Sequence, residues 1–320
     1  MTEIFLTIAI VLLCLLLVKS AGWAIKSLLF ISRFFNLKEF AVAFIFMAFA
    51  TSLPELMVGI NAAFHKTSIL SLGDITGTNI ANLTLILGAI VIIGRGIKVN
   101  RKMVKQDSLY TSIMMVIPLI LLLNGEISRI DGVLLIVSFF TYLSILLRQG
   151  KRHWKVITNG FKSSTGLGLA IKNLGLFFIS IAVLLASSYF IVEAASALAL
   201  KLNIPLFIIG LFLVALGTSL PEFVFGTKAV LLGREKLVLG NLMGSIVVNA
   251  TFILGLVAII SPIEISTLAP VNLGIIFTLL TVLAFFIFIR TDRRISRLEG
   301  GLLILIYIIF IILETVHFPE

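Results

Sequence analysis

The sequence Thr-Ser-Leu-Pro-Glu occupies residues 51–55 and is repeated at residues 218–222, each time inside a long apolar stretch. A carboxylate within a membrane span is costly and marks an ion or substrate pathway more often than it serves packing. The neighbouring proline interrupts the helix and frees a backbone carbonyl. Two copies at corresponding places in two halves of one chain predict a cation site near the middle of a transporter.

The composition indicates a membrane protein. The chain has 320 residues, 60% of them hydrophobic and only 12% charged, with a mean hydropathy of +1.20. A soluble domain would need a more charged surface. The net charge of +10 comes from basic residues in short loops between apolar segments, which indicates membrane orientation rather than nucleic-acid binding. Cys14 is the single cysteine, which excludes a disulfide framework and a cysteine-rich metal site.

Ten apolar segments predict an all-α polytopic membrane protein. The first follows Glu3 rather than a basic region, so we interpret it as a retained span and not as a signal peptide. The first and sixth segments are the longest and are expected to be tilted. The predicted spans cover residues 3–32, 38–63, 69–94, 104–124, 128–148, 168–200, 204–230, 237–261, 268–290 and 298–316.

The distribution of basic residues predicts the orientation. With the N-terminus outside, the cytoplasmic loops hold nineteen lysines and arginines and the external loops three. We therefore predict a multi-pass protein of the plasma membrane with both termini extracellular. Five spans per half place the halves in opposite senses. The predicted organisation is a first repeat at 1–149, a basic cytoplasmic linker at 150–167 and a second repeat at 168–320.

The internal repeat extends beyond the two TSLPE segments. The shift of 167 residues that aligns them also aligns 72–88 with 239–255, where eight of seventeen positions are identical. Several of the shared positions are polar, and these are harder to explain by composition than shared leucines. The repeat therefore lies in spans two and three, and again in spans seven and eight.

The repeated segments carry oxygen ligands. On a helix, Thr51 and Ser52 share a face with Glu55, and Thr78 shares one with Asn82. The second copy repeats this with Thr218, Ser219, Glu222, Ser245 and Asn249. Gly77 and Gly244 are expected to weaken spans three and eight at the same depth. An oxygen-only set with two carboxylates favours a hard cation such as Ca²⁺, and neutral hydroxyls and carbonyls suit Na⁺.

Two glutamates offer enough negative charge to balance one Ca²⁺ or two monovalent ions. A site that can be neutralised either by one Ca²⁺ or by two monovalent ions is a basis for exchange, because the loaded forms could reorient while the doubly charged empty form could not.

Asp74 has Asn241 as its repeat partner, so we expect a structural or vestibule role for it. Glu193 has no acidic partner, and packing or surface solvation is expected.

These residues resemble the two α-repeats of the sodium/calcium exchangers, within the cation/calcium exchanger superfamily. The resemblance is specific at TSLPE and at the Gly-x-x-Gly-[Ser/Thr]-x-x-x-Asn pattern, and extends loosely to all ten spans. It implies ten transmembrane helices as two inverted five-helix repeats. Broken helices two, three, seven and eight would form the ion-binding core, and helices one and six would slide across it to alternate access.

The resemblance also implies roles for individual residues. Glu55 and Glu222 would bind Ca²⁺, with help from the carbonyls of Thr51 and Thr218. One sodium site would use Ser52, Thr78 and the carbonyl of Ala48, and Asn82 would line the centre. The other would use Ser219, Ser245 and the carbonyl of Ala215.

The sequence departs from the family pattern at two positions. Asn249 stands where some members have aspartate, which argues against potassium co-transport and leaves proton coupling open. Ala50 replaces the glycine expected before TSLPE, although Gly217 retains it. The large cytoplasmic regulatory loop of animal exchangers is lacking.

The leading hypothesis is a secondary antiporter that exchanges Ca²⁺ for Na⁺ by alternating access. The alternative is a Ca²⁺/H⁺ antiporter in which Glu55 and Glu222 carry protons, although the proton-coupled branch usually has a different acidic motif. A cation channel fits the inverted repeats less well, and an intramembrane enzyme lacks a nucleophile–base pair. The predicted partners are Ca²⁺, Na⁺ and lipid, with no nucleic acid, no cofactor and no obligate protein partner.

Overall fold

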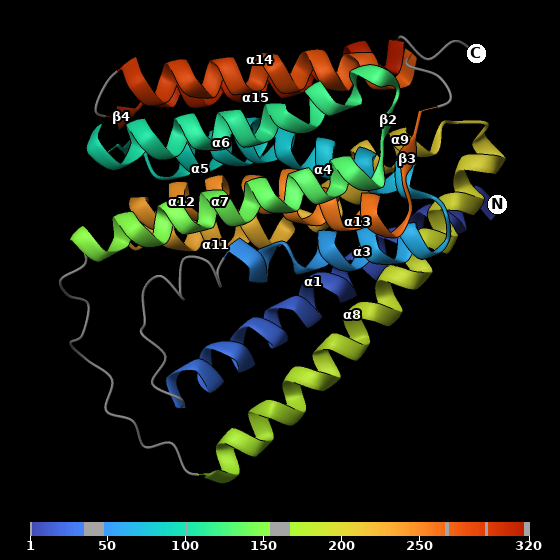
Figure 1. The fold of residues 1–320 in the computed structure, drawn as a ribbon, viewed down its shortest axis with the longest axis horizontal. Helices are drawn as coiled ribbons and strands as arrows, with labels where there is room; N and C mark the ends of the chain where they lie inside the picture. The colour runs from blue at the N-terminus through green and yellow to red at the C-terminus, as the bar shows by residue number, and fades with distance from the viewer. Residues whose placement is uncertain are drawn as a thin grey trace.

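The computed structural model is a bundle of helices and describes residues 2–34, 48–99, 101–153, 167–265, 269–291 and 294–316 (Figure 1). In this part of the chain, eight helices are long and apolar enough to cross a membrane, and two shorter apolar helices span Ile4–Ser20 and Leu53–Phe64. Each of these ten segments overlaps one of the ten predicted spans, and six of them extend one or two residues beyond its bounds. The beginning of the second span and most of the predicted linker at 150–167 lie outside the described residues.

The first half begins with a long helix and continues through the first TSLPE segment. Residues 48–51 are helical and are followed by a turn at Ser52. The elements are α1 (Thr2–Phe34), α3 (Leu53–Phe64), α4 (Ser68–Ala81), the π-helix η1 (Asn82–Ile86), α5 (Leu87–Ile93), β1 (Ile97–Lys98), α6 (Arg101–Leu121), η2 (Leu122–Asn124), β2 (Glu126–Ile127) and α7 (Arg129–His153).

The second half repeats this order. The elements are α8 (Leu167–Leu202), α9 (Leu206–Ile208), the π-helix η3 (Ile209–Val214), α10 (Ala215–Thr218), α11 (Leu220–Leu231), α12 (Glu235–Val247), the π-helix η4 (Val248–Ile253), α13 (Leu254–Ile260), β3 (Ile263–Glu264), α14 (Ala269–Thr291), β4 (Arg294–Ile295) and α15 (Arg297–Val316). α7 and α8 extend to His153 and back to Leu167, so helix occupies the edges of the predicted linker.

Contacts between the halves follow the repeat. Each two-residue sheet pairs one strand from either half: β1 with β4, and β2 with β3. These two sheets lie at opposite ends of the bundle (Figure 1). Gly88 of α5 packs against the backbone of Gly300 in α15, and Gly132 of α7 packs in the same way against Gly255 in α13. Each close helix contact therefore has a counterpart in the other half.

The third and eighth spans each contain a π-helical turn at the same place in the repeat, η1 and η4. The hydroxyl of Thr84 donates to the carbonyl of Ile80, and that of Thr251 donates to the carbonyl of Val247. A threonine bonded to its own helix in this way favours local bending, and π-turns are frequent at functional sites. The interruption expected in these two spans is therefore a wider helical turn.

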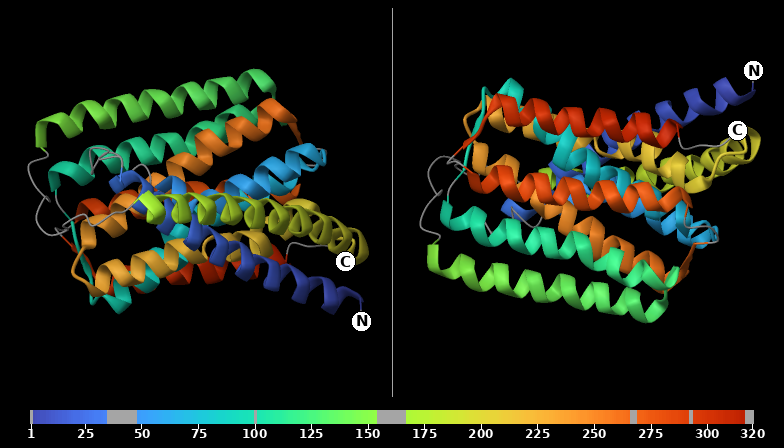
Figure 2. Two further views of the ribbon diagram at one scale, coloured as in Figure 1. Left: turned by 90° about the horizontal axis from the view of Figure 1, so that it is seen from below. Right: turned by 90° about the horizontal axis from the view of Figure 1, so that it is seen from above.

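α1 and α8 stand apart from the rest of the bundle. They pack along each other and are inclined to the other helices (Figures 1 and 2). They are the longest helices described, with 33 and 36 residues. At 1.5 Å per residue both exceed the ~30 Å of a bilayer core, as expected for tilted spans.

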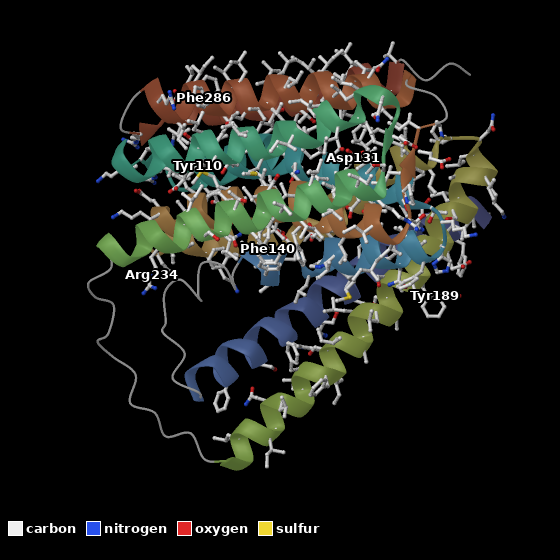
Figure 3. The ribbon with its side chains drawn as sticks, viewed as in Figure 1. Tyr110, Asp131, Phe140, Tyr189, Arg234 and Phe286 are labelled. Atoms are coloured by element: carbon white, nitrogen blue, oxygen red, sulfur yellow. The ribbon has the colours of Figure 1, made fainter. Side chains whose placement is uncertain are left out.

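The outer surface of the bundle is apolar. Side chains such as Phe140 on α7, Phe286 on α14 and Tyr189 on α8 point outward (Figure 3), and many large aliphatic residues on α1, α7, α8, α14 and α15 are exposed. The polar residues of the repeated segments are buried instead. This inversion, with an apolar exterior and a polar centre, is what a lipid environment requires.

Candidate ion-binding site

The two TSLPE segments are turns at which one helix ends and another begins. Ser52 precedes α3 and Ser219 precedes α11, so each proline lies in a first helical turn, where its missing N–H would have no acceptor within that helix. Glu55 and Glu222 lie in the first turns of the same two helices. The positive end of the helix dipole favours a carboxylate there. The local sequence thus begins a new helix at the acidic residue.

One hydrogen-bond network connects the first TSLPE segment to the eighth span. The hydroxyl of Thr51 lies 3.0 Å from that of Ser245 and donates to Oδ1 of Asn241 at 3.3 Å. It also lies 3.3 Å from the carbonyl of Ala48. Ser245 in turn donates to Oε1 of Glu222 at 3.2 Å. These contacts bring the repeated segments of the two halves together.

A second network connects the other TSLPE segment to the third span. The hydroxyl of Thr218 lies 3.2 Å from that of Thr78 and donates to Oδ1 of Asp74 at 3.0 Å. The carbonyl of Ala215 accepts from Thr78 at 3.4 Å, from Thr218 at 3.3 Å and from Ser219. The hydroxyl oxygen of Ser219 also lies 3.4 Å from that of Thr78. Thr218, Thr78, Asp74 and Ala215 occupy the places that Thr51, Ser245, Asn241 and Ala48 hold in the first network, 167 residues away in the sequence.

Many oxygens and nitrogens in this region have no partner. Both carboxylate oxygens of Glu55 are buried without a hydrogen bond, as is Oε2 of Glu222. The same holds for Oγ of Ser52 and for both amide atoms of Asn82. Buried polar atoms normally find partners, because burying one without a partner costs a few kcal/mol. Unsatisfied groups gathered from three spans therefore suggest a ligand site.

The asparagines lie where the π-turns begin. Asn82 opens η1 and Asn249 lies in η4, and both are fully buried. The amide of Asn249 donates to Oδ1 of Asn79 at 3.4 Å, while its own Oδ1 has no partner. The wider turn thus presents amide groups to the centre of the bundle.

Negative charge gathers in the same place. Glu55 lies close enough to Glu222 and Asp74 for their charges to interact. The three side chains are fully buried, and the surrounding segments 48–64, 68–82, 215–222 and 238–249 contain no lysine or arginine. A mobile cation is the natural counter-charge for such a group.

The structure brings together most residues that the sequence assigns to the site. Their exposed fractions are 2% or less. One network joins Thr51, Ala48, Ser245 and Glu222, and the other joins Thr78, Thr218, Ser219 and Ala215. Ser52 in the first TSLPE turn, Glu55 in α3, Asn82 in η1 and Asn249 in η4 are buried with at least one unpartnered polar atom each.

Two sequence expectations concern residues of the third span. Of the two roles expected for Asp74, the structural one agrees with its position, because Asp74 is fully buried and bonded to Thr218. Gly77 does not weaken its helix, since α4 continues through it; a Cβ there would lie 2.0 Å from the carbonyl oxygen of Leu211. Gly77 instead permits close contact with η3.

Sequence reasoning left Asp74, Asn241 and Asn79 out of the site. A usable signal was present, because Asp74 precedes Thr78 by four residues and Asn241 precedes Ser245 by four. Such residues lie on the same helix face.

The donor set suits a hard cation. Within the described residues, no three His, Cys, Asp or Glu side chains converge as a ready-made metal cluster. The available ligands are carboxylate, hydroxyl, amide and backbone oxygens. Such oxygens match Ca²⁺ and other hard ions.

Comparison with known proteins reveals close relatives of this arrangement. The family model described as sodium/calcium exchanger protein matches residues 5–148 and 172–316. The sodium/calcium exchanger MaX1 of Methanosarcina acetivorans is 29% identical over 92% of this chain and 94% of its own length. The inner membrane protein YrbG of Escherichia coli is 28% identical over 80% of each chain.

A solved structure shares the fold. The sodium-calcium exchanger NCX_Mj, soaked with Na⁺ and Sr²⁺, superposes with a TM-score of 0.66 at 27% sequence identity. The match covers 96% of this chain and 98% of that chain.

Proposed function

The chain belongs to the sodium/calcium exchanger protein family, and on this premise we propose that it exchanges Ca²⁺ for Na⁺ across a membrane as a secondary antiporter. Its family is one of transporters and not of enzymes. The fold, with its membrane-spanning helices and two halves of matching element order, suits alternating access around a fixed central site.

One observation carries the proposal. Two glutamates from equivalent positions of the two halves lie fully buried in an apolar bundle, and three of their four carboxylate oxygens have no hydrogen-bond donor. Two such charges without a cation are costly at membrane depth. One Ca²⁺ or two Na⁺ would neutralise them equally, whereas the empty pair would resist reorientation. This equivalence provides the coupling of an exchanger.

The proposed ligands follow the two networks. Glu55 and Glu222, with the carbonyls of Thr51 and Thr218, bind Ca²⁺. Na⁺ occupies the flanking positions, where hydroxyls and carbonyls predominate. On one side these positions comprise Ala48 and Ser245, which share Thr51, and on the other Ala215, Thr78 and Ser219, which share Thr218 or one another. These hydrogen bonds pair Thr78 with Ala215 and Ser245 with Ala48, the reverse of the pairing expected from the sequence. Ser52, Asn82 and Asn249 complete the proposed set.

We propose that the halves, residues 1–149 and 168–320, are related by an axis in the membrane plane and that α1 and α8 slide across the core. The membrane is the plasma membrane, with both termini outside. Arg234 lies at the end of the bundle that this orientation makes cytoplasmic, and Asp131 lies at the other (Figure 3). The excess of basic residues in the predicted cytoplasmic loops supports the orientation.

The test is radiolabelled Ca²⁺ flux into liposomes that contain the purified protein. An outward Na⁺ gradient alone should drive Ca²⁺ uptake, and dissipating that gradient with a sodium ionophore should stop it. A pH gradient imposed without Na⁺ should drive none. Uptake driven only by the pH gradient would overturn the proposal in favour of proton exchange, and single-channel currents would overturn it in favour of a channel.

A further inference from the structure

Asp74 lies in the network of the second TSLPE segment. Its Oδ1 accepts from Thr218 at 3.0 Å, and Thr218 lies 3.2 Å from Thr78. Asp74 is fully buried, and its Oδ2 has no hydrogen-bond partner. The donor that Thr218 offers Asp74 is a neutral hydroxyl, and Oδ2 stays free for another ligand.

The equivalent position in the other half holds a neutral residue. Asn241 accepts from Thr51 at 3.3 Å, and Thr51 lies 3.0 Å from Ser245. The amide nitrogen of Asn241 is buried without a partner. The same arrangement of threonine, hydroxyl and acceptor thus occurs twice, once with a carboxylate and once with an amide.

This difference matters electrostatically because both positions are buried. The surrounding segments 68–81 and 206–219 contain no lysine or arginine, so no fixed cation on these segments neutralises Asp74. Removing a carboxylate from water is costly unless an opposite charge approaches it. A monovalent cation between Asp74, Thr78, Thr218 and the carbonyl of Ala215 would supply that charge.

We infer that Asp74 makes the two monovalent-cation positions of the site unequal, by adding a carboxylate to the position at Thr218 that its counterpart at Thr51 lacks. The inference rests on the proposed exchange and deepens it. Because Asp74 accepts from Thr218 in the network that supplies this monovalent-cation position, it acts on Na⁺ binding more than on Ca²⁺ binding.

The test exchanges the two residues. Asp74→Asn, Asn241→Asp and the double variant are purified, and Na⁺ binding is measured with ²²Na⁺. The half-saturating concentrations of Na⁺ and Ca²⁺ are then measured for flux in liposomes. Asp74→Asn should raise the half-saturating Na⁺ concentration about tenfold, the effect of one charge-assisted contact, and should change that for Ca²⁺ less. The double variant, which moves the charge to the equivalent position, should recover most of the Na⁺ affinity.

Several controls separate charge from structure. Glu314→Gln removes a buried carboxylate from α15, outside both networks, and should leave Na⁺ binding unchanged. If Asp74→Asn does not fold, the inference is tested with Asn241→Asp instead. Its added carboxylate should lower the half-saturating Na⁺ concentration, and an unchanged value would overturn the inference.

Unchanged Na⁺ affinity in a folded Asp74→Asn protein, or equal losses of Na⁺ and Ca²⁺ affinity, would overturn the inference. Failure of the wild-type protein to couple Na⁺ to Ca²⁺ would instead overturn the proposed function. The ²²Na⁺ binding measurement distinguishes these cases, since it does not depend on exchange.

Discussion

At the scale of single residues, the site is defined by polar atoms that the protein itself leaves unsatisfied. Glu55 receives no hydrogen bond, and Glu222 receives one from Ser245. Serine and threonine in a membrane helix ordinarily bond to their own backbone. Here Thr51, Thr78 and Thr218 also reach across to another span. Hydroxyls so oriented can turn toward an ion without moving the backbone.

The first prediction concerns the two glutamates. Glu55→Gln and Glu222→Gln each keep the size of the side chain but remove one charge. Losing a buried charge that faces an opposite charge costs about 3 kcal/mol, or roughly a hundredfold in affinity. We expect Na⁺-driven Ca²⁺ uptake to be abolished at micromolar Ca²⁺ in both variants, while the protein inserts and purifies normally.

Glu314→Gln provides the matched control, since it also neutralises a buried carboxylate but on α15. It should retain uptake. Near-normal uptake by either TSLPE variant would reject the assigned Ca²⁺ ligands.

The second prediction concerns Asn249. Its amide donates to Asn79 at 3.4 Å, and its unpartnered oxygen faces no donor. Asn249→Asp adds a negative charge beside the site and should favour the divalent ion. In competition assays, the Na⁺ concentration that halves Ca²⁺ uptake should rise by about tenfold, as one added charge-assisted contact allows.

Asn203→Asp adds the same charge at an exposed turn and should leave the competition curve unchanged. A curve for Asn249→Asp that matched the wild type would show that position 249 does not contact the ions.

At the scale of helices, the site depends on interruptions of two kinds. The TSLPE turns divide the second and seventh spans, and π-turns widen the third and eighth. Both leave backbone or side-chain oxygens available at membrane depth, which is tolerated only inside protein or beside water. Glycine contacts hold these spans together, with Gly77 against the backbone of η3.

The third prediction tests this contact. A Cβ at Gly77 would lie 2.0 Å from the carbonyl oxygen of Leu211, so Gly77→Ala must separate α4 from η3. Overpacking of this kind costs about 1–3 kcal/mol. We expect a melting temperature in detergent that is several degrees lower, with weaker Ca²⁺ uptake.

Gly175→Ala is the control, because a Cβ added to Gly175 on α8 would have no heavy atom within 4 Å apart from the nearby backbone of its own helix. Alanine favours a helix there over glycine, so the melting temperature should stay the same or rise. Equal melting temperatures for Gly77→Ala and Gly175→Ala would show that α4 and η3 can separate without cost.

At the scale of the whole molecule, α1 and α8 form a pair that contacts the core along one side (Figure 2). Polar contacts between this pair and the core include Asn61 to Ser188 at 2.7 Å and His65 to Glu193 at 3.2 Å. Glu193 is half exposed and bonded at the surface, in keeping with its expected solvated position. An interface that is otherwise largely apolar allows one body to slide over the other.

The fourth prediction tests that motion with the single native cysteine. Cys14 of α1 lies beside Gly217 of α10, with its Cβ 2.7 Å from where a Cβ on Gly217 would be. Gly217→Cys should form a disulfide with Cys14 under mild oxidation after the helices part by about 1 Å. Oxidation should then stop Ca²⁺ uptake, and reduction should restore it.

The double variant Cys14→Ser/Gly217→Cys separates the cross-link from the substitution. Its uptake should not respond to oxidant or reductant. A cross-linked protein that transported at the rate of its reduced form would show that α1 need not move relative to the core.

Much of this molecule follows from sequence patterns alone. Ten spans, an internal repeat and ten candidate site residues stand out in the sequence because charged and polar residues are rare in membrane helices, whereas Ala48 and Ala215 were expected only from the family resemblance. A TSLPE segment that occurs twice inside apolar sequence therefore indicates an ion or substrate pathway. The great lengths of α1 and α8 could also be predicted, because a long apolar run in a membrane protein forms a long membrane-spanning helix.

The tertiary structure alone decided which segments of one half contact which segments of the other. It therefore decided where Asp74 lies. Helical spacing puts Asp74 on one face with Thr78, but only the crossing of α4 over η3 and α10 brings it to Thr218. The role of Gly77 was decided in the same way. Side-chain periodicity records which residues share a helix face, whereas the partner of that face depends on long-range packing between segments about 140 residues apart.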